Sequence, residues 1–215
     1  MASIDSSKGP SASQSLYDGF KYPLLVYAMM ASLYIYSSKG YIWFSLHPIA
    51  MLVAFVAMAG NATLIKKVGG LVNTRMHGVI MSAATILAAF GFYVIYTNKV
   101  MKAKDNTAKS KSGKIFEAKH FTSLHGQVGL AVMVGYTGLA VVGAVALHPD
   151  FGVFKAPNLP GKPNPIRVIH KFAGKAMTAL AWVSCVLGVQ SMGKDFWHQA
   201  VFAVPLLLMG LKVLL

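Results

Sequence analysis

Six long apolar runs determine what this chain can fold into. The hydrocarbon core of a bilayer is about 30 Å thick, and a helix needs roughly 20 residues to cross it. Because backbone polar groups in lipid must be satisfied internally, and the runs are too long for barrel strands, the sequence predicts an all-α integral membrane bundle. The predicted spans are 20–38, 42–65, 76–97, 122–147, 168–192 and 196–214.

Composition leaves little room beside this bundle. The chain has 215 residues, of which 55% are hydrophobic, so any chemistry is expected in the bundle or in its short loops. The Ser-rich residues 1–19 are predicted to form a disordered tail, and residues 20–215 to form one membrane domain. Cys185 is the one cysteine, so no disulfide within the chain is expected.

The charge of the chain is strongly positive and lies between the spans. The formal net charge is +14, from 20 Lys and Arg against 6 Asp and Glu. Anchoring to lipid headgroups accounts for much of this excess, and attraction of a small anionic substrate is the other interpretation. The basic residues are scattered over short loops and form no single stripe, so nucleic acid is not an expected partner.

Four histidines fall near the starts of predicted spans. Short connections make successive spans alternate in direction. We therefore call face A the side where the spans at 42, 122 and 196 begin, and face B the side where those at 76 and 168 begin. His47 and His125 are expected at face A, and His77 and His170 at face B. The alternation of the spans alone thus predicts two histidine pairs stacked across the membrane.

Such pairs suit two metal centres with bis-imidazole ligation. Imidazole nitrogen is a common axial ligand of haem iron, and two such ligands leave no open position, which favours electron transfer over oxygen binding. Gly129 and Gly174 each follow a histidine by four residues, one helical turn away, where a flat macrocycle needs room. From the residues alone, hydrogen-bonded packing histidines remain the alternative.

The same motifs resemble the cytochrome b561 family of six-helix, di-haem membrane proteins. The segment "LHPIAM" resembles the family's W-H-P-x-x-M, with Trp43 displaced to four residues before the histidine. The segments "SLHGQVGL", "MHGV" and "IHKFAG" resemble the other three ligand positions, over roughly residues 20–193. The resemblance implies two haem b groups between helices 2–5, one held by His47 and His125 and the other by His77 and His170.

The family also implies an activity. Its members are transmembrane ascorbate-dependent oxidoreductases, which take electrons from cytosolic ascorbate and deliver them to monodehydroascorbate or ferric iron on the other side. The segment "KHFTSLHGQVG" most resembles the branch typified by cytochrome b561 domain-containing protein 2. Ascorbate, monodehydroascorbate or a ferric chelate, and membrane lipid are therefore the expected partners.

Basic residues beside the histidines are the candidate substrate-binding residues. On face B, Arg75, Lys66 and Lys67 precede His77, and the family uses this loop to hold the anionic donor. A guanidinium fork can bind an enediolate or a haem propionate through paired hydrogen bonds.

On face A, His120 and Lys119 end a Lys-rich segment, 98–120, that is expected to be mostly mobile and solvated. In the family this position lies in the acceptor pocket, where an imidazole can hydrogen-bond an organic radical or relay a proton. Outside the paired pattern, His148 and His198 are interpreted as interfacial residues.

Orientation and cellular membrane follow from the resemblance alone. Face B with the termini carries eleven Lys and Arg and face A carries nine, so the positive-inside rule does not decide. The family places face B and the N-terminus in the cytosol, in an endomembrane such as the ER or a vesicle, or in the plasma membrane. Small residues in "GYTGLAVVGAV" favour tight helix packing, within one chain or in a homodimer.

Two other functions stay open. A quinol-linked di-haem subunit of a larger redox complex would be reduced by quinol and not by ascorbate. A transporter or channel with histidine proton relays would hold no haem, and the spans show no buried carboxylates to support it.

Overall fold

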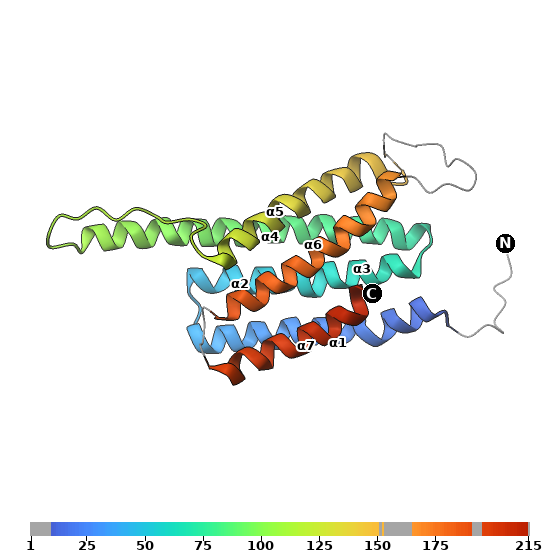
Figure 1. Cartoon of the computed structure of the whole chain (residues 1–215), viewed down its shortest axis with the longest axis horizontal. Coiled ribbons are helices and arrows are strands. Elements are labelled where there is room, and N and C mark those ends of the chain that lie inside the picture. The colour runs from blue at the N-terminus through green and yellow to red at the C-terminus, as the bar shows by residue number, and fades with distance from the viewer. Residues whose placement is uncertain (1–9, 151, 153–164, 191–194, 215) are drawn as a thin grey trace.

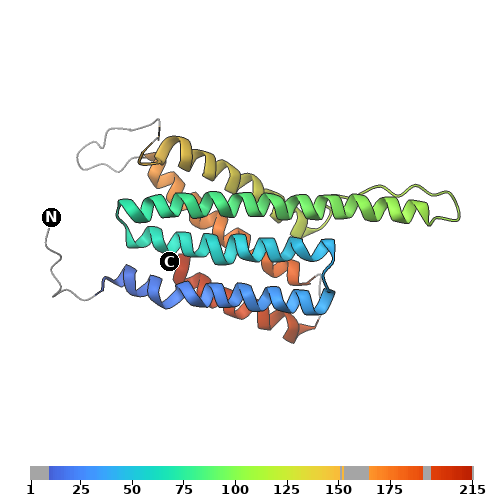
Figure 2. The ribbon, with the colours of Figure 1, turned by 180° about the vertical axis from the view of Figure 1, so that it is seen from behind.

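The computed structural model describes residues 10–150, 152, 165–190 and 195–214. The described residues form a helical bundle without strands, in which helices α3 and α4, α5 and α6, and α1 and α3 pack side by side (Figures 1 and 2). The helices are α1 (Ala12–Lys39), α2 (Leu46–Met51), α3 (Ala59–Val68), α4 (Leu71–Ala108), α5 (Leu124–Val142), α6 (Pro165–Gln190) and α7 (Phe196–Leu214), with the short segments η1 (Trp43–Ser45), η2 (Leu52–Met58) and η3 (Gly143–Leu147).

The prediction of an all-α membrane bundle is confirmed. Each predicted span corresponds to a helical segment. Four of these are long and apolar enough to cross a membrane, namely Trp43–Val68, Leu71–Ala108, Leu124–Leu147 and Pro165–Gln190, and Gln199–Leu214 is a shorter apolar helix. The helices alternate in direction, so the ends of α1, α4 and α6 and the starts of η1, α5 and α7 share face A, as the alternation of the spans required (Figure 1).

Two helices extend beyond the apolar runs that predicted them. Helix α1 begins at Ala12, where the Ser11 hydroxyl caps it by accepting from the Gln14 amide (3.2 Å), so residues 12–19 of the predicted tail are helical. Residues 1–9 of that tail lie outside the described residues. Helix α4 continues to Ala108, so the prediction of a mobile segment from residue 98 was wrong for its first half. A hydropathy pattern marks only the apolar part of a helix, so it does not predict the polar turns by which α1 and α4 extend.

The second span is one continuous helical segment with a π-helical stretch at its centre. Segments η1, α2, η2 and α3 follow without a break, and η2 has the wider π geometry. A π turn disturbs the regular hydrogen-bond ladder, and here the Trp182 indole donates to the Phe55 carbonyl (2.9 Å). Phe55 also packs against Tyr136 (ring centroids 4.9 Å apart), whose hydroxyl bonds Thr178 (2.8 Å). These contacts join α5 and α6 to the second span in mid-membrane.

Helices α1 and α7 form an outer layer against this core. The Tyr27 hydroxyl of α1 donates to the Phe202 carbonyl of α7 (2.8 Å). Leu24 of α1 is fully buried and packs over Gly60 of α3, where an added Cβ would lie 3.0 Å from the Leu24 side chain and 3.3 Å from the Trp182 ring. Gly60 therefore sets how closely α1 and α6 approach α3.

We predict that Gly60→Val destabilises the protein by about 1–3 kcal/mol, because the new methyl groups overpack this contact. Gly138→Val is the matched control, since Gly138 is also helical and has no neighbour within 4 Å of an added Cβ. Thermal unfolding in detergent, followed by circular dichroism, should separate the two variants. Equal melting temperatures would contradict the packing role of Gly60.

Candidate functional site

The first histidine pair lies near face A. His47 on α2 and His125 on α5 face each other with ring centroids 6.2 Å apart and planes at 75°. Nδ1 of His47 lies 2.9 Å from the Gly91 carbonyl of α4, and Nδ1 of His125 lies 2.9 Å from the Ser184 carbonyl of α6. A carbonyl only accepts, so Nδ1 must carry the proton in both rings and Nε2 keeps its lone pair. Both rings thus have one nitrogen free for a ligand bond.

A cavity opens around this pair, with about 260 Å³ of free space. His120, a predicted substrate residue, lies in its wall and stacks on Tyr96 with ring centroids 4.2 Å apart. Lys99, which the sequence analysis did not select, also lines the cavity, and its Nζ donates to the Lys119 carbonyl (3.0 Å). The Lys119 side chain, also a predicted substrate residue, is exposed.

The second histidine pair lies near face B. Nδ1 of His77 on α4 bonds the Ala62 carbonyl of α3 (2.9 Å). His170 on α6 is close enough to His77 to interact with it electrostatically. Its Nδ1 is buried and has no hydrogen-bond partner among the described residues. The structure therefore brings together the same two pairs that the alternation of the spans predicts. Three of the four rings are bonded to a carbonyl, and the fourth is held by packing.

Glycines give room to two of the rings, and these are not the glycines that the sequence pattern singled out. An added Cβ at Gly188 would lie 3.1 Å from the His125 ring, and one at Gly143 would lie 3.2 Å from the His170 ring. Gly129 lines the face A cavity, whereas Gly174 has no neighbour within 4 Å. Each ring-facing glycine lies 18 residues after the histidine of its own helix, at 125 to 143 and at 170 to 188, and faces the histidine of the partner helix.

That shared spacing was the signal in the sequence. Helices α5 and α6 are antiparallel neighbours, so the start of each lies beside the end of the other. At each end of this helix pair, the histidine near the start of one helix therefore faces the glycine that lies about five turns along the other helix. The H-x3-G pattern predicts space on the histidine's own helix, but in the structure a glycine of the neighbouring helix provides that space.

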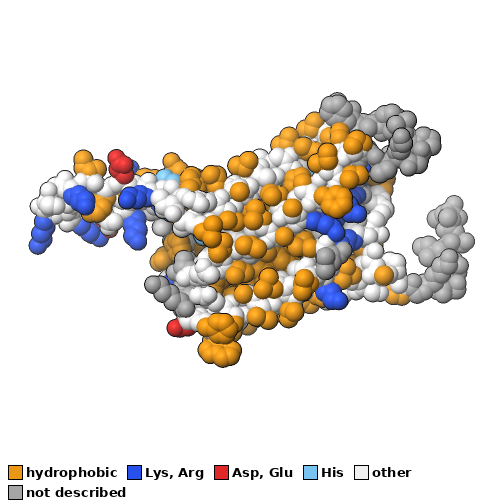
Figure 3. All heavy atoms as spheres, viewed as in Figure 1, with side chains coloured by type: hydrophobic (Ala, Val, Ile, Leu, Met, Phe, Trp, Pro, Cys, Tyr) orange, Lys and Arg blue, Asp and Glu red, His pale blue; other side chains and the backbone are white. Residues whose placement is uncertain are grey.

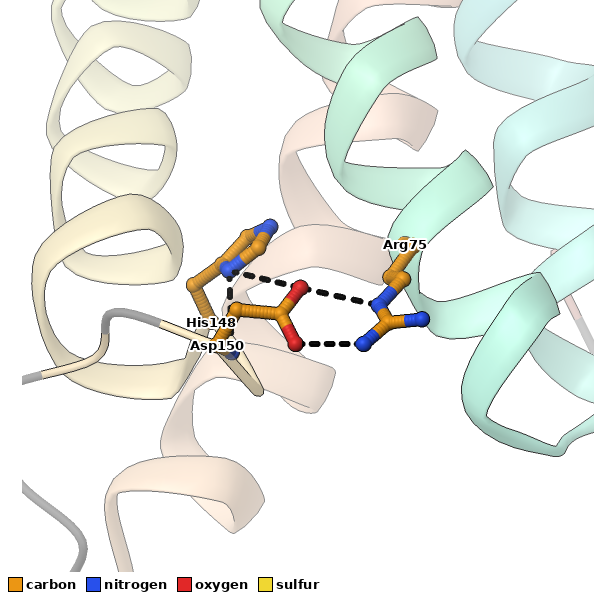
Figure 4. A network of polar contacts seen from close by, with 3 residues as sticks. All are labelled: Arg75, His148 and Asp150. Carbon is orange, nitrogen blue, oxygen red and sulfur yellow. Dashed lines mark hydrogen bonds and ion pairs between the residues drawn. The ribbon is translucent and has the colours of Figure 1, made fainter.

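Arg75, a predicted substrate residue, is engaged by a carboxylate. Its Nε donates to Oδ2 of Asp150 (2.8 Å) and its Nη2 to Oδ1, and the Asp150 amide donates to Nδ1 of His148 (3.2 Å), as Figure 4 shows. Hydrogen bonding to Arg75 holds the pKa of Asp150 below its usual value. The guanidinium fork thus ties the start of α4 to the connection after η3, and His148 belongs to this network.

Five other cations gather at face B. Lys66, whose Nζ donates to the Thr74 hydroxyl (2.6 Å), is repelled by Arg167 of α6, and Lys67 is repelled by Lys171 and Lys175 of the same helix. Among the described residues no carboxylate forms an ion pair with any of the five. Figure 3 shows basic side chains at this end of α6. The sequence analysis selected the two α3 lysines as substrate residues but not the three α6 cations, which lie beside them although they are distant in the chain.

Comparison with known proteins supplies the family. The model of the family described as eukaryotic cytochrome b561 matches residues 46–194, which begins just before His47 and contains both histidine pairs. The chain belongs to the cytochrome b561 family. A comparison with curated proteins finds no match. Membership implies a multi-pass membrane protein that binds haem b and transfers electrons across the membrane.

The histidine geometry fits a haem of the cytochrome b561 type. An imidazole nitrogen binds a transition-metal ion at about 2.0–2.1 Å, so two rings on opposite sides of one ion have centroids roughly 6 Å apart. The rings of His47 and His125 are 6.2 Å apart and keep Nε2 free. The cavity and the glycines beside the rings leave space for a planar group.

The Arg75 and Asp150 pair leads to a prediction about pH. Because the folded-state pKa of Asp150 is lowered, the pair stabilises the fold above the unfolded value of 3.8, and this contribution is lost as pH falls through the folded-state pKa. The melting temperature of the wild type should exceed that of Asp150→Asn at about pH 5, where the Asp150 carboxylate is almost fully ionised in the folded and the unfolded state. The difference should vanish in more acidic buffer.

Arg75→Gln is the matched control for this measurement. Adding Asp150→Asn to Arg75→Gln should lower the melting temperature less than Asp150→Asn does alone, because the main partner of the carboxylate is already gone. A wild-type advantage that persists unchanged far below the ordinary Asp pKa would contradict the ion pair.

Proposed function

We propose that this chain carries electrons from ascorbate at face B to monodehydroascorbate or a ferric chelate at face A, through two haem b groups. One observation supports it above the rest: two histidine pairs lie near opposite faces of one bundle, and each pair joins two helices that begin at the same face. Haem b, when bound, supplies reversible one-electron chemistry without open coordination positions.

His47 and His125 are the proposed axial ligands near face A, and His77 and His170 those near face B. The carbonyl bonds at Nδ1 of three of these rings fix the tautomer and the ring orientation, and they make Nε2 a better ligand. The apolar bundle around the pairs excludes water, which would otherwise compete for the ligands and change the reduction potentials.

The face B cations are the proposed donor site. Ascorbate is an anion at neutral pH, and Lys66 and Lys67 lie where Arg167, Lys171 and Lys175 concentrate positive charge. Bringing these like charges together costs free energy, and a bound anion relieves that repulsion. Arg75 remains part of the proposed site, but Asp150 must release its fork before Arg75 can bind an anion, so the lysines are expected to contribute more to affinity.

The face A cavity is the proposed acceptor site. The His120 ring stacks on Tyr96 and also contacts the Phe121 ring. These contacts hold the imidazole in the wall of the cavity. A hydrogen bond from this ring to an organic radical, or contact with a ferric chelate, fits that position. Lys119 and Lys99 add positive charge beside it.

The branch and the cellular placement remain part of this proposal. The segment "KHFTSLHGQVG" supports the branch of cytochrome b561 domain-containing protein 2. By that resemblance face B and the N-terminus are cytosolic, and the membrane is an endomembrane or the plasma membrane.

Haem content of single histidine variants tests the proposal. The detergent-purified wild type should hold two haems per chain and be reduced by ascorbate. Replacing any one of His47, His125, His77 or His170 with leucine should leave one haem, since each site needs both axial ligands. His148→Gln should keep both. Full haem content in a ligand variant would overturn the assignment, and two haems reduced by quinol but not by ascorbate would favour a quinol-linked subunit.

Donor affinity tests the face B cations. Lys67→Gln should raise the KM for ascorbate by about three- to fivefold and leave kcat unchanged, because the lost attraction acts on binding. Lys212→Gln removes one charge from another part of face B and is the matched control. An equal KM for both variants, or a loss confined to kcat, would argue against a donor site at Lys67.

A further inference from the structure

Helix α4 carries a projection beyond face A, which we call the arm (residues 98–119). The Trp43 indole donates to the Thr97 hydroxyl (2.9 Å) and its ring packs edge-on against Tyr93. Tryptophan marks the headgroup level in membrane proteins. At 1.5 Å per residue, the helix from Thr97 to Ala108 projects about 16 Å past this level. Figures 1 and 2 show the arm standing out from the bundle along the helix axes.

The arm is an ordered element and not the mobile loop that its composition predicted. The return segment is tied to the helix by the Thr107 hydroxyl, which accepts from the Phe116 amide (2.8 Å). The tip turns at Gly113, with φ +67°, and the Ser110 hydroxyl accepts from the Lys114 amide (3.0 Å). A shallow groove with apolar walls lies between helix and return segment, lined by Val100, Ala103, Lys104, Thr107, Ala108, Ile115, Phe116 and Ala118. A preformed surface loses little entropy when a partner binds it.

The arm is strongly basic. It holds seven lysines against Asp105 and Glu117, a net charge of 7 − 2 = +5. Asp105 is paired with Lys109 (2.7 Å), so it neutralises a neighbour at the tip. Six of the lysines are exposed, and Figure 3 shows basic side chains along the visible face of the arm. Ile115 is 77% exposed and Phe116 is 39% exposed, so apolar side chains lie among these charges.

We propose that the arm is a docking site for an acidic protein surface at face A. Its reach past the headgroups points away from the membrane that holds the bundle. A small anion would need no platform of this length. The combination of lysines with exposed Ile115 and Phe116 fits a protein that brings both carboxylates and apolar side chains. A second copy of the chain fits poorly, because its own formal net charge is +14.

The position of the arm gives the docking a purpose. Its return segment leads directly into His120 and Phe121, which line the face A cavity, and Lys99 at its base lines the same cavity. A protein held on the arm therefore sits beside the cavity mouth. The docking rests on the arm itself; if the proposed function also holds, the docked protein stands where electrons leave.

Binding of an acidic probe tests the proposal. The full chain is placed in nanodiscs of phosphatidylcholine, and a fluorescent polyglutamate peptide is titrated by anisotropy. The wild type should bind, and binding should weaken with salt. The double variant Lys104→Gln with Lys114→Gln should bind about three- to tenfold more weakly. Lys39→Gln with Lys212→Gln removes the same charge elsewhere and should bind as the wild type does.

Two further measurements keep the outcome decisive. Replacing Lys104 and Lys114 with arginine should retain binding, and circular dichroism should show equal helicity in all variants. Equal weakening in the arm and control variants would overturn the proposal. So would binding of the arm to phosphatidylserine vesicles but not to polyglutamate, which would make the partner a membrane surface. Reduction by ascorbate is measured in parallel, and a change there alone would bear on the proposed function and not on the arm.

Discussion

The bond from a histidine Nδ1 to a backbone carbonyl of a neighbouring helix is the interaction on which the site depends. His47 reaches Gly91 on α4, and His77 on α4 reaches Ala62 on the second span, so these two helices hold each other's histidines. His125 reaches Ser184 on α6 in the same way. Each bond fixes the orientation of a ring. It also fixes how far one helix is shifted along the other, because each carbonyl lies at a single level along its helix. The same hydrogen bonds therefore determine the packing of the bundle and the geometry of the site.

The fourth ring shows what happens where that bond is missing. The turns beside the His170 ring have π geometry, which begins at Gly143. A π turn displaces the carbonyls that follow the regular ladder. His170 thus keeps its place by packing, and its Nδ1 is left without a partner among the described residues. The two faces, alike in their histidines, differ in how firmly the rings are held.

Much of this arrangement could be predicted from the sequence. Span length and alternation fixed the helices and the histidine pairs, since in a membrane these follow from bilayer thickness and chain direction alone. The carbonyl partners, the glycines at 143 and 188 and the α6 cations could not be found, because they depend on which helices are neighbours. Nor could the pairing of Arg75 with Asp150, which lie 75 residues apart, or the arm, whose order comes from side-chain to backbone bonds such as that at Thr107.

Helix α4 is one unbroken rod from Leu71 to Ala108. Along its length it holds the Arg75 pair, His77, the Gly91 carbonyl that positions His47, and the arm. A straight helix is stiff over this distance, so a pull or push on the arm does not stay at the tip. Any axial displacement of α4 would move the Gly91 carbonyl and the His77 ring together, because both belong to this helix. One helix thus connects the water beyond face A with both histidine pairs inside the membrane.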